Sequence, residues 1–354
     1  MADPQTQPSP SEAPPAAAAA VPSVPALTPW YRQAGPLALL GLGLLLMAPP
    51  VFLGMGEEFY ITLLTRMVIY GLAAASLDLI LGYGGMVSFG HAAFVGVGGY
   101  VAGLLAYHGM MSEPVLFGLA ASGTNNLLIL WSAAMLGGGF AAFVIGSICL
   151  RTTGVHFIMI TLAFAQMVFF FFVSLEAYGG DDGLPLWYRA EVPGLGLDDD
   201  LSVYYLAVGL LALFLLLARR LTQSRFGLVI RAARQNPERL AALGVPVYRH
   251  KLILFTLAGA VAGLAGAMEV NQTGYLSPSL MQWTRSGELL VIVILGGMGT
   301  LFGPVLGAIA FIALEHVLAG WTEHWALVFG PALVLCVLFF RTGLWGLICK
   351  EPRG

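Results

Sequence analysis

The residues best suited to chemistry lie in one glycine-rich stretch, DLILGYGGMVSFGH at 78–91. It combines a carboxyl, a hydroxyl and an imidazole with several bare backbone amides in otherwise apolar sequence. Irregular backbone at membrane depth is tolerated only where it is buried in protein or lines a cavity. The stretch therefore favours one of two structures. It lines a substrate path with Ser88 and His91 as polar contacts, or it packs tightly around glycine while His91 bonds to a neighbouring carbonyl.

A second stretch, GGMGTLFG at 296–303, resembles GGMVSFG at 84–90. Matching glycine-interrupted segments in the two halves of a chain are typical of transporters with internal repeats and a site near the membrane midplane. Chance similarity is the alternative in a chain with 45 glycines. If the repeats are real, their relation is either inverted or parallel.

Other polar side chains lie deep in apolar sequence. Asp78 and Gln166 are expected to face protein or water, either on the substrate path or in structural hydrogen bonds, because intramembrane polar groups are costly. Glu269, Glu288 and Glu315 fall near the ends of predicted spans, where long side chains reach the membrane surface at little cost. The candidate substrate-path residues are Asp78, Gly84, Gly85, Ser88, His91, Gln166, Gly296 and Gly297.

Enzymatic motifs are missing from the sequence. It has no G-x-x-x-x-G-K-[ST], no G-x-S-x-G, no carboxylate pair at catalytic spacing and no His/Cys cluster. The three cysteines, Cys149, Cys336 and Cys349, have no spacing typical of disulfides or metal sites. We therefore expect no catalytic residue, no metal and no cofactor on this chain, and ATP, if used, must be hydrolysed by another chain.

The composition predicts an integral membrane protein, with 58% hydrophobic and only 10% charged residues. Apolar runs of about 20 residues without period-2 alternation indicate helical spans, not a barrel. Residues 1–34, rich in proline and alanine, are expected to be a disordered tail, followed by a transmembrane domain at 35–350. The ten expected spans are 36–54, 62–82, 87–108, 127–149, 154–174, 201–218, 252–272, 286–300, 302–320 and 325–348.

Charge orients these spans. The loop at 219–251 holds eight of the 16 basic residues and one acid, which places it in the cytoplasm. The loop at 176–200 carries seven acids and one arginine and is expected outside. Both termini then lie in the cytoplasm. Arg285 falls outside, an exception that a re-entrant segment near 273–290 would explain.

The basic loop contains the pattern of a short helix at 236–244. Asn236 can cap it, Pro237 suits its first position and Gly244 can end it in the left-handed conformation. Such a helix fits a groove on a soluble partner; the alternative is a solvated loop that only fixes the topology. The residues expected to couple to a partner are Arg231, Arg234, Asn236, Pro237, Glu238, Leu240, Leu243 and Gly244.

Several strings together resemble the LivM-type permease subunit of branched-chain amino acid ABC transporters. They occur in the family's order and cover most of the chain beyond residue 60. The strings are LGYGGMVSFGHAAFVGVGGYVAGLL (81–105), ITLAFAQMV (160–168), GGDDGL (179–184), FGLVIRAARQNPERLAALGVPVYRHKL (226–252), LAGAVAGLAGAM (257–268), GELLVIVILGGMGTLFGPVLGA (287–308) and FFRTGLWGL (339–347).

The resemblance implies half of a membrane channel in a bacterial inner membrane. Its implied partners are a LivH-type permease, two cytoplasmic ATPase subunits and a periplasmic binding protein, besides membrane lipid, with no role for nucleic acid. By position, 236–244 is the coupling helix and the turn at 84–91 lies on the translocation path. Asp78 departs from the asparagine common in the family, which leaves the exact substrate open.

Other functions also fit the sequence. Urea-type relatives tend to have glutamine at the position of His91, so the sequence favours an amino acid over urea. The alternatives are an ion-gradient-driven secondary transporter, and an ABC permease for another small solute such as urea, amides or organic acids. A purely structural membrane scaffold is the third possibility.

Overall fold

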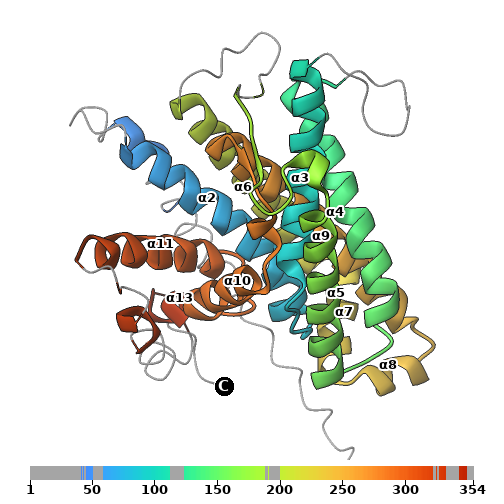
Figure 1. The fold of residues 1–354 in the computed structure, drawn as a ribbon. Helices are drawn as coiled ribbons and strands as arrows, with labels where there is room; N and C mark the ends of the chain where they lie inside the picture. Colours follow the sequence, from blue (N-terminus) through green and yellow to red (C-terminus); the bar gives the residue numbers. More distant parts are fainter. Residues whose placement is uncertain are drawn as a thin grey trace, which may run out of the picture.

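The computed structural model describes residues 41, 43, 45–50, 59–111, 123–187, 190, 200–321, 324, 327–331 and 343–348. In this part of the chain, a two-residue strand pair accompanies an otherwise helical fold, so the all-α class is confirmed (Figure 1). In chain order the elements are α2 (Phe59–Asp78), η1 (Leu79–Tyr83), α3 (His91–Met111), α4 (Leu127–Cys149), α5 (Val155–Val173), η2 (Glu176–Tyr178), β1 (Leu184–Pro185), α6 (Asp200–Gln223), α7 (Arg225–Gln235), α8 (Pro237–Ala242), α9 (Val247–Thr273), β2 (Tyr275–Leu276), η3 (Pro278–Met281), α10 (Trp283–Gly296), α11 (Gly303–Trp321) and α13 (Gly343–Ile348).

Seven helices in the described residues are long and apolar enough to cross a membrane, compared with ten predicted spans. They are α3, α4, α5, α6, α9, α11 and α2 extended by η1. The predicted spans at 36–54 and 325–348 lie partly, and the predicted tail at 1–34 wholly, outside the described residues. The chain is therefore a multi-pass membrane protein.

The predicted span at 286–300 differs from the observed helix. Here α10 has 14 residues, Trp283–Gly296, which makes it about 21 Å long and shorter than a bilayer core of about 30 Å. It ends because Gly297 has φ 119°, a conformation that leaves the helix and favours glycine. The sequence predicted a membrane span here because the apolar stretch continues beyond Gly297.

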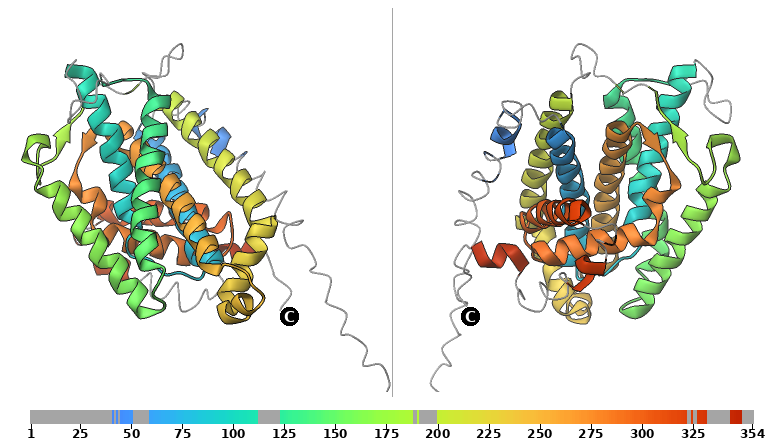
Figure 2. Two further views of the ribbon diagram at one scale, coloured as in Figure 1. Left: turned by 90° about the vertical axis from the view of Figure 1, so that its right-hand side faces the viewer. Right: turned by 60° about the vertical axis from the view of Figure 1, so that its left-hand side comes forward.

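Glycine allows α3, α4 and α9 to pack closely. A Cβ on Gly138 of α4 would lie 2.7 Å from the carbonyl oxygen of Gly259 on α9, and one on Gly98 of α3 would clash with the backbone of Gly263. Small residues at such contacts let backbones approach, which is how helices associate in lipid. These three helices stand side by side, while α10 and α11 run at a steep angle to them (Figures 1 and 2).

The most buried span is α2. Of its 20 residues, 14 are buried, because α6, α9, α10 and α11 pack around it. Gly71 lies against Val305 of α11, where an added Cβ would make ordinary contacts of 3.6 Å. Only a helix surrounded by protein can hold polar groups such as Asp78 away from lipid.

The described residues of the acidic segment, 176–187, 190 and 200, lie at the opposite end of the bundle from the basic segment. At one end, Thr62 donates a 3.0 Å hydrogen bond to Asp200 at the start of α6. At the other, Tyr248 donates a 2.8 Å bond to the carbonyl of Ser147. Helices α7 and α8 lie at this second end (Figure 1).

The chain turns back into the bundle after α9. Gly274, with φ 63°, ends α9, and β2 then pairs antiparallel with β1. Leu276 lies against Gly103 and Met281 against Gly96, both on α3. The segment 274–281 therefore descends along α3 by about 10 Å.

Candidate functional site

The first glycine-rich stretch contains a π-helical turn. In η1, the Gly84 amide donates to the Leu79 carbonyl at 3.2 Å, five residues back. Single π-turns are rare in proteins as a whole, and those that occur are often found at functional sites. Just before it, buried Asp78 accepts a 2.8 Å hydrogen bond from the Gly299 amide. The two glycine-rich stretches, 221 residues apart at this bond, are thus directly connected.

The basic segment meets the same turn. Arg234, the last basic residue of α7, donates through Nη1 to the Gly82 carbonyl. Its side chain also covers Gly85, where an added Cβ would lie 2.7 Å from Arg234 Cγ, and where φ is 68°. A Cβ on Gly82 would clash with Asp78 Oδ1 and the Gly299 backbone. We call Asp78, Gly82, Gly299 and Arg234 the η1 junction.

Ser88 and His91 are buried and bonded within the protein. His91 Nε2 lies 2.8 Å from Ser76 Oγ, which itself donates to the Ala73 carbonyl at 2.7 Å. Ser88 Oγ accepts from the Gly90 amide at 3.2 Å. Both side chains are 0% exposed. The side-chain partner of His91 is therefore a hydroxyl of α2.

The remaining residues predicted to line the substrate path are Gly84, Gln166, Gly296 and Gly297, and they do not form one cluster. Gln166 is partly buried on α5, and none of the hydrogen bonds in the described part of the chain joins it to the η1 junction. Gly84 is in the turn after η1. Gly296 faces the Gly303 backbone, and Gly297 lies beside Gly343 of α13. The structure brings these glycines to helix ends near the junction but leaves Gln166 apart from it.

The predicted short helix is present as α8. Asn236 accepts a 2.9 Å bond from the Arg239 amide, Pro237 occupies the first turn and Gly244 has φ 80°. Leu243, at its end, is 74% exposed. Of the remaining predicted coupling residues, Arg231 is tied to the Thr222 carbonyl at 3.3 Å, Glu238 is exposed and Leu240 is partly buried.

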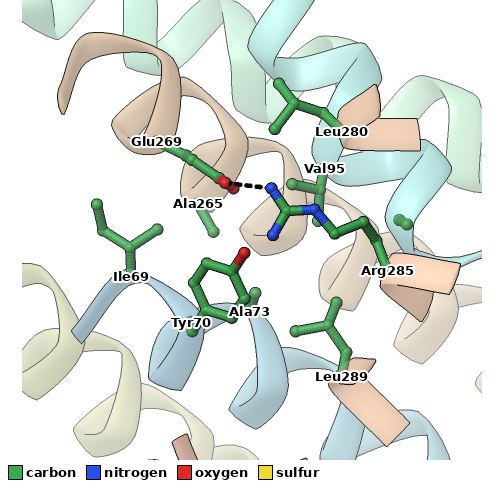
Figure 3. A pocket seen from close by; sticks show the side chains of 10 residues that line it. Ile69, Tyr70, Ala73, Val95, Ala265, Glu269, Leu280, Arg285 and Leu289 are labelled. Carbon is green, nitrogen blue, oxygen red and sulfur yellow. Dashed lines mark hydrogen bonds and ion pairs between the residues drawn. The ribbon is translucent and has the colours of Figure 1, made fainter. Parts of the chain in front are cut away.

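A small cavity lies where α2, α3, α9, η3 and α10 meet (Figure 3). An ion pair closes one side, with Arg285 Nη2 2.7 Å from Glu269 Oε1. Tyr70 of α2 adds its ring and hydroxyl. The rest of the lining is apolar and includes Ile69, Val95, Leu280 and Leu289.

Sequence reasoning missed this cavity. It expected Glu269 and Glu315 to reach the membrane surface, but Glu269 is 14% exposed and paired inside the bundle. Glu315 pairs with Arg66 of α2 at 3.1 Å. The single available signal was Arg285, whose charge did not fit the topology. Its partner, Glu269, could not be identified from the sequence, because the two residues meet only through the turn at 274–281, which the sequence did not predict.

In the part of the chain that the structure describes, glycine-packed helices form a multi-pass bundle with the short helices α7 and α8 at one end, an arrangement that fits the class of membrane permeases. The chain belongs to the family described as "Branched-chain amino acid transport system / permease component", which matches residues 59–338. This confirms the resemblance seen in the sequence.

Curated relatives agree with this family. The chain is 27% identical to the high-affinity branched-chain amino acid transport system permease protein LivM of Escherichia coli, over 87% of this chain and 74% of that protein. It is 23% identical to LivH of Salmonella typhimurium, over 78% of this chain and 91% of the relative. It is 24% identical to the D-allose transport system permease protein AlsC of Escherichia coli, over 82% and 87%. No solved structure matches.

Proposed function

We propose that this chain forms half of the translocation path of a bacterial ABC importer for branched-chain or related amino acids. A LivH-type permease supplies the other half, two cytoplasmic ATPase subunits supply the energy, and a periplasmic binding protein delivers the solute. The chain itself binds no cofactor, and ATP is used by the partner subunits. Membership of the permease family and the similarity to LivM and LivH support this assignment.

The proposed orientation places the basic end of the bundle in the cytoplasm, together with both termini. The loop at 219–251 carries eight basic residues, and arginine-rich loops are retained on the cytoplasmic side. The acidic segment at 176–200 then faces the periplasm. In this orientation α8 projects toward the compartment where ATPase subunits reside.

One observation carries the proposal: the η1 junction connects the projecting α7–α8 segment to both glycine-rich stretches. Leu243 offers an exposed apolar contact for a partner on α8. Arg234, at the end of α7, holds the Gly82 carbonyl, and Asp78 holds Gly299 one turn away. Movement of α8 with an ATPase subunit is therefore transmitted to the turns at which α2 and α10 end, as alternating access requires.

The test is purification of the tagged chain from cells that express all subunits of the importer. We expect it to bring down two ATPase subunits and a second permease. Leu243→Asp puts a charge into the proposed contact and should remove the ATPase subunits while the second permease stays bound. Trp187→Asp is the matched control, because Trp187 is similarly exposed (77%) at the opposite end of the bundle.

Equal recovery of the ATPase subunits with Leu243→Asp and Trp187→Asp would contradict docking through α8.

Amino acid uptake distinguishes the energy source. Uptake that persists without ATP and stops when the proton gradient is removed would contradict an ABC importer and favour a secondary transporter.

A further inference from the structure

The outward face of α10 carries residues that do not suit contact with lipid. Thr284, Gly287, Glu288 and Val291 follow one another at helical spacing and so share one face. Thr284 is exposed, and an added Cβ on Gly287 would meet nothing within 4 Å among the described residues. The side chain of Glu288 is 42% exposed. This face therefore presents small residues and a carboxylate to its surroundings.

The outward faces of α4, α5 and α6 show the lipid-facing surface that this chain makes elsewhere. Large apolar side chains are exposed on these helices, among them Leu136, Phe140, Met159, Phe170, Leu213 and Leu216. Helix α10 lies on the far side of the bundle from α4 (Figures 1 and 2). The contrast indicates that lipid covers α4, α5 and α6 and that something else covers α10.

Helix α10 begins inside the bundle, at membrane depth. Leu276 lies against Gly103 of α3 and Met281 against Gly96, so the chain descends by about 10 Å before α10 starts at Trp283. Ionisable side chains at such depth are costly in lipid and almost always face protein or water. A cover other than hydrocarbon is therefore needed over this face.

Charged side chains of four helices meet beside this face. Arg66 of α2 pairs with Glu315 of α11 at 3.1 Å, and Arg285 of α10 pairs with Glu269 of α9 at 2.7 Å. The ring of Tyr70 connects the two pairs, because the Cζ atoms of the two arginines lie 5.3 Å and 5.2 Å from its centre. The two ion pairs thus form one group.

Glu288 is the third carboxylate of this group and the least tightly held. Its Oε2 lies 3.9 Å from Arg285 Nη1, whereas Glu269 lies 2.7 Å from the same side chain. When all are ionised, the three glutamates and two arginines of the group carry one negative charge in excess. A protein surface that covers Glu288 must supply a positive charge, because an unpaired charge removed from water is strongly unfavourable.

We propose that the second permease subunit packs against the outward face of α10 and places an arginine or lysine beside Glu288. Thr284 and Gly287 leave room for a helix of that subunit at close approach, as small residues do between helices in lipid. The proposal rests on the proposed function, because it names the surface at which the two halves of the permease meet.

The charge of the face selects a different chain as its partner. In a twofold symmetric homodimer the same patch lies on both subunits, so this face would bring two copies of Glu288 together. Like charges placed opposite each other at an interface are unfavourable. An apolar helix would leave the carboxylate without a partner. A second permease with a basic side chain at this position satisfies both requirements.

The first test is photo-crosslinking in membranes of cells that express all subunits of the importer. A benzophenone amino acid replaces Thr284 or, in a second variant, Val291 two turns further along the same face. The matched control is Leu136 on α4, which is 75% exposed and apolar. We expect adducts with the second permease from both α10 positions and none from Leu136.

Three results of this experiment would overturn the proposal, provided that the second permease is recovered with each variant. The first is the absence of an adduct from both α10 positions. The second is an adduct with the second permease from Leu136 alone. The third is that the α10 positions react only with another segment of this chain or with a second copy of it.

The second test changes the charge of the face and measures recovery of the second permease with the tagged chain. Glu288→Lys should lower recovery at least about tenfold, because two positive charges then meet at the contact. Glu288→Gln keeps a hydrogen-bonding group without the charge and should lower it about fivefold. Asp181→Lys is the matched control, because Asp181 is an exposed acid away from α10, and should leave recovery unchanged.

A compensating exchange separates a lost contact from a damaged fold. In cells that express Glu288→Lys, each arginine and lysine in the membrane spans of the second permease is replaced in turn by glutamate. We expect one of these exchanges to restore recovery, because it recreates the pair with its charges reversed. Restoration by none of them would overturn the proposed pairing.

The outcomes keep this inference apart from the proposed function. A wild-type chain that brings down no second permease would refute the heterodimer of the proposed function, and this surface with it. A second permease that is recovered with the wild type but crosslinks only through α4 would refute the α10 surface and leave the proposed function intact.

Discussion

Replacing Asp78 tests whether the η1 junction is held by one hydrogen bond. Asp78→Ala removes the acceptor of the Gly299 amide, a 2.8 Å bond in a partly buried setting. Leaving a buried donor unsatisfied costs about 2 kcal/mol, which corresponds to about a 30-fold change in local opening. Asp78→Asn keeps an acceptor oxygen, so its effect should be smaller, about fivefold.

Hydrogen–deuterium exchange of a peptide containing 296–303 measures this opening. We expect exchange at Gly299 to accelerate in the order wild type, Asp78→Asn, Asp78→Ala. Exchange within α4, which lies away from the junction, should be the same in all three and serves as the internal control. Equal exchange in wild type and Asp78→Ala would show that the bond does not hold the loop. Equal acceleration in both variants would show that the charge, not the acceptor, matters.

Two further perturbations test the contacts around α2. Arg234→Ala removes the donor to the Gly82 carbonyl and should lower the number of solute molecules transported per ATP while the ATPase subunits stay bound; an unchanged ratio would exclude this route. Ser76→Ala leaves His91 Nε2, 2.8 Å away, without its hydroxyl partner and should destabilise the protein by about 1 to 3 kcal/mol. Thermal unfolding of the purified chain measures this, and an unshifted midpoint would contradict a structural role for His91.

Local signals in the sequence were sufficient for α8. Asn236, Pro237 and Gly244 each act within a few residues of where they stand, and all three do so in the structure. The same reasoning found the glycine-rich stretches, because helix breaks depend on nearby residues. Their contact through Asp78 and Gly299 could not be predicted, since no local property connects positions so far apart in the chain.

Hydropathy failed where the chain enters the bundle without crossing it. Residues 286–300 are as apolar as a span, yet α10 stops at Gly296 and begins only after the turn at 274–281. Glu269 was expected near the membrane surface because it lies close to the end of the apolar run at 252–272. Its side chain is buried because Arg285 returns to meet it, and a count of apolar residues contains no information about that return.

The π-turn at η1 gives α2 a surplus residue at its junction end. Each residue in an α-helix rotates the chain about the helix axis by about 100°. If the extra residue of the π-turn moved along α2, each side chain that it passed would rotate about the axis by roughly this angle. Tyr70 lies two to three turns from η1 on the same rod. Such a shift would rotate the α2 side chains that line the cavity, among them Tyr70, without a hinge and without displacing the ends of the bundle.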